Sequence, residues 1–524
     1  MQQFARAAAL AALLAFACAA SAQLTDRTRA PNALDAGIAK SLEQQIGAGR
    51  GDVDTPDASL YIIARDPFRS VRRGRQLFQR KFAVSQGQGP GIGDGAGDIG
   101  AAPGIGAGLS DNCAICHAGP RGSAGIGGSN ATRPDSRRAP HLFGIGLKEM
   151  LGDEMTEELR AQRAEARARA AKLGVAVSVP LVAKGVRFGS LTARPDGSLD
   201  TSKVEGVNPD LRVRPLGRQG TRFSLREFTV QAFRAELGLQ AFDPDLNTAR
   251  AGGRAVTPSG MVLDGATDTF EPFPPVTEAN DPDGDGVVNE FPTALVDHFE
   301  FYLLNYFKPG THEQTRVTRE GRRTFMEVGC GRCHVPDLVV KRDRRVADVE
   351  TEFDEKTPGF NRLFATATPL FDVVADGSAH PARKLPRGKP FVVKNIFSDL
   401  KRHDLGPAFH ERNYNGTITT QFLTAPLWGI GSAGAFGHDG RSINLKEVIL
   451  RHGGEAQRSR DDFARLRHDE QAAVIEFLNA LVLFPPDDTD SNLNPGDPAT
   501  PGYPQFGHGS IRLPALFNDA TDPE

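Results

Sequence analysis

The chain has 524 residues, too many for one ordinary hydrophobic core, so we expect two domains with long connections. Its 62 basic and 65 acidic side chains give a net charge of −3, which excludes the strongly basic field typical of nucleic-acid-binding proteins. Five cysteines are too few to hold a secreted scaffold of this size together by disulfides.

The first 22 residues have the pattern of a secretory signal peptide. Arg6 supplies a basic start, an apolar run follows, and Ala20-Ser21-Ala22 offers small residues for cleavage before Gln23. Cys18 would leave with this segment. An acylated Cys18 is the weaker alternative, because the leucine usually found three residues before a lipoprotein cysteine is missing. Later apolar runs are too short to cross a membrane, so we expect an exported, periplasmic protein without a membrane span.

The four remaining cysteines lie in two copies of one short motif. In each copy a histidine directly follows the second cysteine: Cys113, Cys116 and His117, and Cys330, Cys333 and His334. Each thiol of such a pair can add to one vinyl group of a haem, and the histidine then becomes the proximal ligand of the iron. The sequence therefore predicts two covalently bound c-type haems.

Two other interpretations of these motifs are weaker. A thioredoxin-like redox pair needs no histidine at this position and would follow a strand of a βαβ unit, which neither segment resembles. A zinc site built from the four thiols does not explain a histidine after each pair. Because two identical motifs use every cysteine of the mature chain, the haem interpretation is favoured.

A weak internal repeat places a helix ahead of each motif. GRQLFQRKF (74–82) precedes the first motif and GRRTFMEVG (321–329) runs directly into the second. Both begin with glycine and carry a phenylalanine four residues later, Phe78 or Phe325. A glycine-rich insertion follows the first copy. It has neither the strand nor the Lys-Ser/Thr of a phosphate-binding loop, so we expect a flexible loop.

The remaining pattern predicts a mainly α protein with long irregular loops and few short strands. Helical stretches are expected at 153–174, 223–242, 294–307 and 460–484. We divide the mature chain into an N-terminal extension (23–64), a first c-type haem domain with insertions (65–310), a second haem domain (311–485) and a C-terminal tail (486–524).

An acidic stretch, DPDGDGVVNE (281–290), lies between the two haem motifs. Asp281, Asp283 and Asp285 alternate ahead of a glycine, which is the spacing with which an acidic loop surrounds calcium with oxygen ligands. The twelfth position of a full EF-hand is Pro292 here, although Glu290 could substitute for the missing glutamate. We expect a structural calcium site, with a solvated acidic turn as the alternative.

The segment TAPLWGIGSAGAFGHDGRSINLKEVILRHGGEA (424–456) resembles the C-terminal signature of the bacterial dihaem oxidoreductases, often labelled thiol oxidoreductases. APHLFGIGLKEML, DPDGDGVVNE and HDLGPA are also similar to landmarks of this family, which is related to dihaem cytochrome c peroxidases. The resemblance implies an all-α, two-domain fold, a reactive N-terminal haem and an electron-transferring C-terminal haem. It also implies a protein that donates or accepts electrons, such as a small periplasmic cytochrome or a cupredoxin.

For the first haem, reactivity requires an open or exchangeable sixth position on the iron. In related peroxidases a loop histidine after the motif can occupy that position. Here the next histidine is His141, so we expect an open first haem, with ligation by His141 as the alternative. Met150 and Met155 on the following helix are expected to be packing residues.

The stretch FSLREFTVQAFRAELG resembles the family helix that carries a distal acid, the group that moves a proton between the oxygens of peroxide. Glu236 occupies the matching position, Glu227 and Gln231 are lesser candidates, and a solvent-facing glutamate is the alternative. Relatives also carry a tryptophan between the haems just before this helix, and this chain does not. Its only tryptophan, Trp428, or a phenylalanine would fill that place. Otherwise long-range hole transfer is weaker here, and the usual peroxidase activity is less expected.

For the second iron, no methionine follows Cys333, and Met326 precedes the motif too closely to reach the opposite face. In related peroxidases the axial methionine lies fourteen residues after the histidine of an H-D-G or H-S-G turn. The residue at that distance from His438 is His452. We therefore predict low-spin His334/His452 ligation, with a lower reduction potential than a His/Met counterpart. His438 would orient the pocket, and His403 is the lesser competitor for ligation.

The preferred hypothesis is thus an exported dihaem oxidoreductase of the peroxidase type. Two alternatives remain open at this point: a haem-dependent oxygenase that binds dioxygen at the first haem, and an electron-transfer cytochrome without a substrate. The spin states of the two irons would separate them.

Overall fold

The computed structural model describes residues 42–80, 112–117, 139–271, 286–306, 315–352, 362–413 and 416–483, together with 82, 124, 277–279, 281 and 309. Several features expected from the sequence lie outside these residues: the signal peptide with Cys18, the glycine-rich insertion, Asp283, Asp285 and the C-terminal tail.

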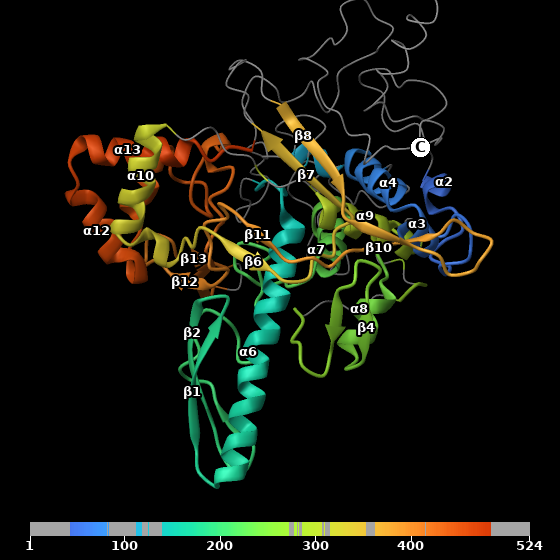
Figure 1. The fold of residues 1–524 in the computed structure, drawn as a ribbon, viewed down its shortest axis with the longest axis horizontal. Coiled ribbons are helices and arrows are strands. Elements are labelled where there is room, and N and C mark those ends of the chain that lie inside the picture. The colour runs from blue at the N-terminus through green and yellow to red at the C-terminus, as the bar shows by residue number, and fades with distance from the viewer. Residues whose placement is uncertain are drawn as a thin grey trace, which may run out of the picture.

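Helices occur in both halves of the described chain (Figure 1). The α-helices are α2 (Leu42–Ile46), α3 (Ser59–Arg65), α4 (Pro67–Gln79), α5 (Cys113–Cys116), α6 (Ile145–Leu173), α7 (Leu225–Ala232), α8 (Pro244–Arg250), α9 (Thr293–Asn305), α10 (Arg316–Glu327), α11 (Leu445–Arg451), α12 (Gln457–Arg465) and α13 (His468–Asn479). Shorter helical turns are a π-helical segment η2 (Phe233–Leu237) and the 3₁₀ turns η3 (Cys330–Arg332), η4 (Ile430–Ser432) and η5 (Gly454–Ala456).

Short antiparallel strands surround the helices. They are β1 (Val177–Ala183), β2 (Val186–Ala193), β3 (Leu199–Asp200), β4 (Arg254–Val256), β5 (Val262–Asp264), β6 (Leu338–Val340), β7 (Ala347–Glu352), β8 (Arg362–Pro369), β9 (Phe371–Val374), β10 (Arg383–Pro386), β11 (Phe391–Val393), β12 (Arg402–Asp404), β13 (Glu411–Arg412), β14 (Ile418–Thr419) and β15 (Gln421–Leu423). One sheet has three strands in the order β1-β2-β3, and the others are pairs: β4–β5, β6–β11, β7–β8, β9–β10, β12–β15 and β13–β14. The described part of the chain is thus mainly helical at its cores, but not all-α as the family resemblance implies.

In the first half of the chain, helix α4 crosses helix α9 at very close range. Gly74 makes this possible, because a Cβ atom at this position would collide with the carbonyl of His298 and with the Cβ of Tyr302. Phe78, one turn further along α4, is fully buried and stacks on Phe299 of α9 with ring centroids 5.8 Å apart. The glycine and the phenylalanine of the first repeat therefore build one helix crossing.

The second repeat builds the same crossing in the second half of the chain. A Cβ atom on Gly321 of α10 would collide with the carbonyl of Ala473 on α13. Phe325 then packs edge-to-face on Phe477, with ring centroids 5.6 Å apart. The two helices lie together at one side of the molecule (Figure 1). The internal repeat seen in the sequence is therefore a repeat of helix-crossing geometry.

Two clusters of buried apolar side chains follow from these crossings. The smaller cluster draws only on residues between Phe325 and Leu481, within the predicted second domain. The larger extends across the expected 310/311 boundary, because it includes Leu338, Ile396 and Trp428 as well as residues of the first half. The segments after the second motif thus contribute to both cores, and the domain limits stay a prediction.

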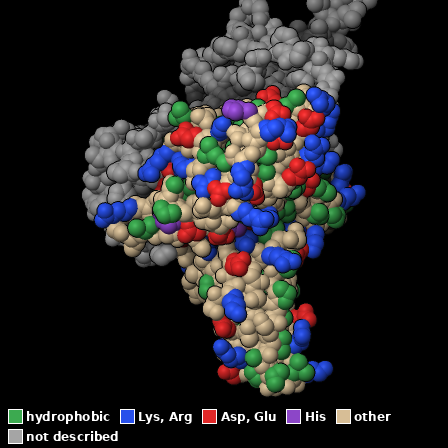
Figure 2. Space-filling view, turned by 90° about the vertical axis from the view of Figure 1, so that its left-hand side faces the viewer, with side chains coloured by type: hydrophobic (Ala, Val, Ile, Leu, Met, Phe, Trp, Pro, Cys, Tyr) green, Lys and Arg blue, Asp and Glu red, His purple; other side chains and the backbone are tan. Residues whose placement is uncertain are grey.

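Helix α6 forms an arm that extends from the body with the β1-β2-β3 sheet beside it (Figure 1). It begins eight residues before the expected stretch 153–174 and ends at Gly174, whose φ of +68° and N–H bond to the Ala170 carbonyl form a left-handed C-cap. Buried Ala166 on its inner face packs against the sheet, whereas Leu173 at the tip is 59% exposed. Positive and negative side chains are interspersed over the face shown in Figure 2.

The other predicted helices also differ in detail. The stretch 223–242 is α7 followed by the π-helical η2, and 460–484 is split into α12 and α13. The split occurs because Leu466 and Arg467 are extended, and the side chain of Glu470 accepts a hydrogen bond of 2.9 Å from the Arg467 N–H at the new helix start. Among the described residues, no helix combines the length and apolarity needed to span a bilayer.

Candidate functional site

The first cysteine pair lies on the single helical turn α5, which brings Cys113 and Cys116 to the same side. His117 continues this turn, with its N–H bonded to the Cys113 carbonyl at 3.0 Å. The ring Nδ1 of His117 lies 2.8 Å from the carbonyl oxygen of Pro140. Because a carbonyl can only accept, Nδ1 carries the proton, and the metal-binding lone pair is on Nε2.

The second motif repeats this arrangement on the 3₁₀ turn η3. The His334 N–H bonds to the Cys330 carbonyl at 3.0 Å, and the ring Nδ1 donates to the carbonyl of Phe397 at 2.9 Å. Desolvation lowers the pKa of His334 to about 4, so its imidazole is neutral, as an iron ligand must be.

The repeated phenylalanines complete the likeness between the two motifs. The ring of Phe78 lies 6.0 Å from that of His117, and the ring of Phe325 lies 6.1 Å from that of His334. Both pairs are tilted, at 56° and 49°. The same three features, a crossing glycine, a phenylalanine and a carbonyl-bonded histidine, therefore surround each cysteine pair.

The chemistry of the thiols does not match a redox pair. Desolvation raises the pKa of Cys113 and of Cys330 to about 12, whereas disulfide oxidoreductases need a lowered thiol pKa. Nor do the four thiols converge on a metal. Among the described residues, only Cys333, Asp399 and His403 bring three potential metal-binding atoms within 4.8 Å of one another. Neither a redox pair nor a shared metal site therefore accounts for the two cysteine pairs.

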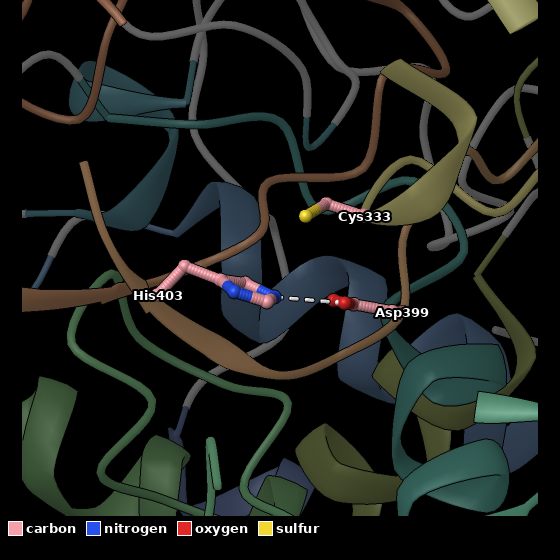
Figure 3. A group of neighbouring side chains, drawn as sticks. All are labelled: Cys333, Asp399 and His403. Carbon is pink, nitrogen blue, oxygen red and sulfur yellow. Dashed lines mark hydrogen bonds and ion pairs between the residues drawn. The ribbon is translucent and has the colours of Figure 1, made fainter. Parts of the chain in front are cut away.

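His403 in that group is held on both sides by carboxylates, and Figure 3 shows its bond to one of them, Asp399. Its Nε2 lies 2.8 Å from Asp399 Oδ2, and its Nδ1 lies 2.7 Å from Glu455 Oε2. Desolvation opposes a charge here, but the hydrogen bonds, first that to Asp399, raise the pKa of His403 to about 12. A charged imidazole with both nitrogens engaged has no lone pair for iron, so the geometry does not favour His403 as the competing ligand.

His452 is differently placed, at the C-cap of α11. Its Nδ1 donates to the carbonyl of Val448 at 2.6 Å, which leaves the lone pair on Nε2, as in His117 and His334. Desolvation lowers its pKa, which favours the neutral imidazole. Val448 and Ile449 of α11 pack against the same apolar cluster as Cys330 of the second motif.

The H-D-G turn (438–440) that precedes α11 is connected to His452 through aromatic contacts. The His438 ring stacks on Phe422 with centroids 3.6 Å apart and an interplanar angle of 13°. Phe409 connects this turn to the ligand candidate, because its ring lies 5.7 Å from His438 and 5.2 Å from His452. His438 is thus linked through Phe409 to His452, and its role in ordering a haem pocket stays a prediction.

Near the first motif, Glu236 lies in the π-helical segment η2. Such segments interrupt α-helices at functional sites more often than elsewhere. Glu236 is exposed, and its charge contributes to the raised pKa of Cys113, so it lies in the neighbourhood of the first cysteine pair. Glu227 is buried, and desolvation raises its pKa. Gln231 is half-buried.

His141, which follows the first motif in the sequence, is hydrogen-bonded to Trp428, which follows the second. His141 Nε2 donates to the main-chain carbonyl of Trp428 at 3.0 Å, and desolvation lowers the pKa of His141 to about 3. The Trp428 side chain is buried, and a Cβ atom on Gly144 would lie 2.9 Å from its ring. Met150 and Met155 are buried in the larger core, as expected of packing residues.

The acidic loop is described only at its ends. Asp281 Oδ2 accepts a bond of 2.9 Å from the Gly286 N–H, and Glu290 Oε2 accepts one of 2.6 Å from the Gln240 N–H. Asp283 and Asp285 lie outside the described residues, so calcium binding stays a prediction. Glu290 is buried and ties the loop to the segment after η2.

Comparison with known protein families supports the resemblance predicted from the sequence. A family model described as "Di-haem oxidoreductase, putative peroxidase" matches residues 368–481. The predicted resemblance is confirmed. The matched segment contains the H-D-G turn, α11 and His452.

No curated protein matches the chain. Two solved structures are weakly similar. The hydrazine synthase of Kuenenia stuttgartiensis, pressurised with xenon, is 15% identical over 57% of this chain and 78% of its own, with a TM-score of 0.24. A MauG-like protein associated with microbial copper homeostasis is 12% identical over 67% of this chain and 90% of its own, also with a TM-score of 0.24.

Several contributors to the site could not be read from the sequence. Pro140 and Phe397 act through their main-chain carbonyls, which any residue possesses. Glu455 is separated from His403 by 52 positions, and only the pairing of β12 with β15 and the close approach of η5 bring them together.

Proposed function

We propose that this protein is an exported dihaem c-type oxidoreductase of the peroxidase type. The observation that carries the proposal is the duplicated arrangement around the cysteine pairs. In each copy a histidine donates Nδ1–H to a main-chain carbonyl, at 2.8 and 2.9 Å, and the centroid of a phenylalanine ring lies 6.0 or 6.1 Å from that of the histidine. One haem at each copy would use both thiols, with the histidine Nε2 available to bind its iron.

The residues present fit such a group. Cys113 and Cys116 would hold the first haem and Cys330 and Cys333 the second, with His117 and His334 below the irons. When bound, haem iron supplies one-electron redox chemistry and a site for oxygen-containing ligands. The protein supplies neutral imidazoles in a fixed tautomer, and apolar walls formed by Phe78 and Phe325.

The two haem sites would have different roles, electron transfer at the second and peroxide cleavage at the first. His452 presents its Nε2 lone pair, so it would be the second ligand of the C-terminal iron, and that haem would be suited to electron transfer. At the first site, Glu236 is the candidate to hold and return a proton during peroxide cleavage. The electron partner would be a small periplasmic cytochrome or a cupredoxin. The match of residues 368–481 to the di-haem oxidoreductase model supports this proposal, and the mixed charge of the surface in Figure 2 is compatible with it.

Haem counting tests the proposal directly. Cys113→Ala and Cys330→Ala should each remove one haem's worth of pyridine haemochrome absorbance from the purified protein, and the double variant should remove both. Cys113 and Cys330 variants that each retain two haems would overturn the proposal. An electron paramagnetic resonance spectrum of the oxidised protein then separates the classes. One high-spin and one low-spin iron support the peroxidase type, two low-spin irons that bind no carbon monoxide indicate an electron carrier, and a stable oxygenated form as purified indicates an oxygenase.

A further inference from the structure

A continuous chain of hydrogen bonds and peptide links joins the two motif histidines. It begins at His117, whose Nδ1 donates to the Pro140 carbonyl at 2.8 Å. The next residue is His141, whose Nε2 donates to the Trp428 carbonyl at 3.0 Å. These two hydrogen bonds connect two residue pairs that are separated in the sequence, His117 with Pro140 and His141 with Trp428.

From Trp428 the chain passes along the backbone to Leu427. The Leu427 N–H donates to the Ile396 carbonyl at 3.0 Å. Phe397 follows directly, and its carbonyl accepts from His334 Nδ1 at 2.9 Å. Four hydrogen bonds and short covalent segments therefore lead from one proximal histidine to the other.

We propose that this chain is the electron path between the two haems and that the His141 side chain is its essential link. The inference rests on the proposed function, since it needs a haem at each motif. One electron leaves the second haem, which is oxidised, and enters the first, which is reduced, while no atom or proton is transferred. Electronic coupling decays less through covalent and hydrogen bonds than across van der Waals gaps, so an unbroken chain is favoured.

A glycine next to Trp428 allows His141 to reach the Trp428 carbonyl. Gly429 has a φ of +75°, and a Cβ atom there would lie 2.9 Å from His141 Nε2. A glycine is therefore required for the imidazole to approach the backbone at 428–429. Because Nε2 donates to a carbonyl, His141 occupies a single tautomer. This hydrogen bond fixes the point at which the segment of His141 meets the segment of Trp428.

The path runs through the carbonyl of Trp428 and not through its indole ring. This distinguishes it from transfer by oxidation of the tryptophan side chain. The two routes predict opposite results for two substitutions, since Trp428→Phe keeps the carbonyl and removes the indole, whereas His141→Leu keeps the indole and removes the hydrogen bond.

The experiment uses the full dihaem protein in its half-reduced form with carbon monoxide as the probe. Flash photolysis of the carbon monoxide complex gives the rate of electron exchange between the haems. We expect a severalfold slower rate for His141→Leu, partial recovery for His141→Gln, whose amide can still donate, and an unchanged rate for Trp428→Phe. An unchanged rate in His141→Leu, or a loss confined to Trp428→Phe, overturns the inference.

Three controls keep this result separate from other causes. Haem content and both reduction potentials should be the same in all variants, and a haem count below two in the parent protein would instead overturn the proposed function. A change in the spin state of the first haem in His141→Leu would identify His141 as its ligand and overturn the path. A ¹⁵N NMR spectrum of the His141 imidazole should show Nε2 protonated, and a proton on Nδ1 alone would contradict the hydrogen bond on which the path depends.

Discussion

Nη2 of Arg451 lies 2.7 Å from both carboxylate oxygens of Asp439. Asp439 is the central residue of the H-D-G turn, and Arg451 is the last residue of α11, directly before His452. The Arg451 guanidinium also lies over the ring of Phe409, 4.1 Å from its centroid, and this ring contacts both His438 and His452. The turn and the helix end are therefore held as one unit, which gives His452 a fixed position at the end of α11.

The first prediction concerns this histidine. His452→Ala should turn the second haem from low-spin to high-spin, because the variant offers no sixth ligand, whereas His452→Met should keep it low-spin and raise its reduction potential. Electron paramagnetic resonance and a redox titration measure the two effects. His468→Ala, which changes a histidine on another helix, is the control and should alter neither. A His452→Ala protein with a fully low-spin second haem would show that the ligand lies elsewhere.

The second prediction tests the duplicated helix crossing. Gly321→Ala should lower the free energy of unfolding by about 1–3 kcal/mol or more, because the added methyl group collides with the Ala473 carbonyl and forces α10 away from α13. Gly74→Ala should do the same to the crossing of α4 and α9. Thermal unfolding followed by circular dichroism provides the measurement. Arg323→Ala, an exposed change on α10, should stay within about 0.5 kcal/mol of the parent.

These crossings also show what the sequence could predict. The glycine, the phenylalanine and the cysteine motif are local patterns, so the two repeated motifs and the helices that precede them were predictable from the sequence alone. The missing methionines and the family register name His452 as a candidate ligand, and its ligation stays a prediction. The partners of His117 and His334 were not, because main-chain carbonyls leave no trace in the sequence.

The differences in the fold have similar causes. The α6 arm starts earlier than predicted because Ile145, Leu147 and Leu151 are buried by tertiary contacts that the charged pattern of 153–174 does not reveal. The π-helical turn at Glu236 depends on one extra residue in a helical turn, which no periodicity resolves. The small sheets form by pairing of distant segments, such as β6 with β11, and their strands are too short to stand out.

The third prediction concerns the distal acid. Glu236→Gln should slow peroxide cleavage by about 10²-fold or more without loss of haem, because the amide cannot accept and return a proton. Stopped-flow absorbance of the half-reduced protein mixed with hydrogen peroxide measures this rate. Glu227→Gln is the matched comparison on the same helical stretch, and it should have the smaller effect. Equal rates in Glu236→Gln and the parent protein would remove Glu236 from the mechanism and leave Glu227 to be tested in its place.

The last prediction concerns a buried carboxyl group outside both haem sites. Glu149 on α6 is fully buried, its Oε1 lies 2.6 Å from Arg344, and its Oε2 accepts from the Leu225 N–H at the start of α7. Desolvation raises its pKa from 4.5 to about 7, since the favourable charge of Arg344 only partly compensates. Between these values the folded protein retains a proton that the unfolded chain has released.

Stability must therefore fall as the pH rises from 4.5 to 7, by at most about 1.4 kcal/mol per pH unit from this group, and the loss is constant above 7. In Glu149→Gln this contribution is absent, so the free energy of unfolding of the parent minus that of the variant should decrease across the window. Urea unfolding at several pH values measures the difference, in which other titrating groups cancel. Glu157→Gln, an exposed change on the same helix, should show no such trend. If the difference instead increases with pH, the pair with Arg344 dominates, and the pKa of Glu149 is lowered rather than raised.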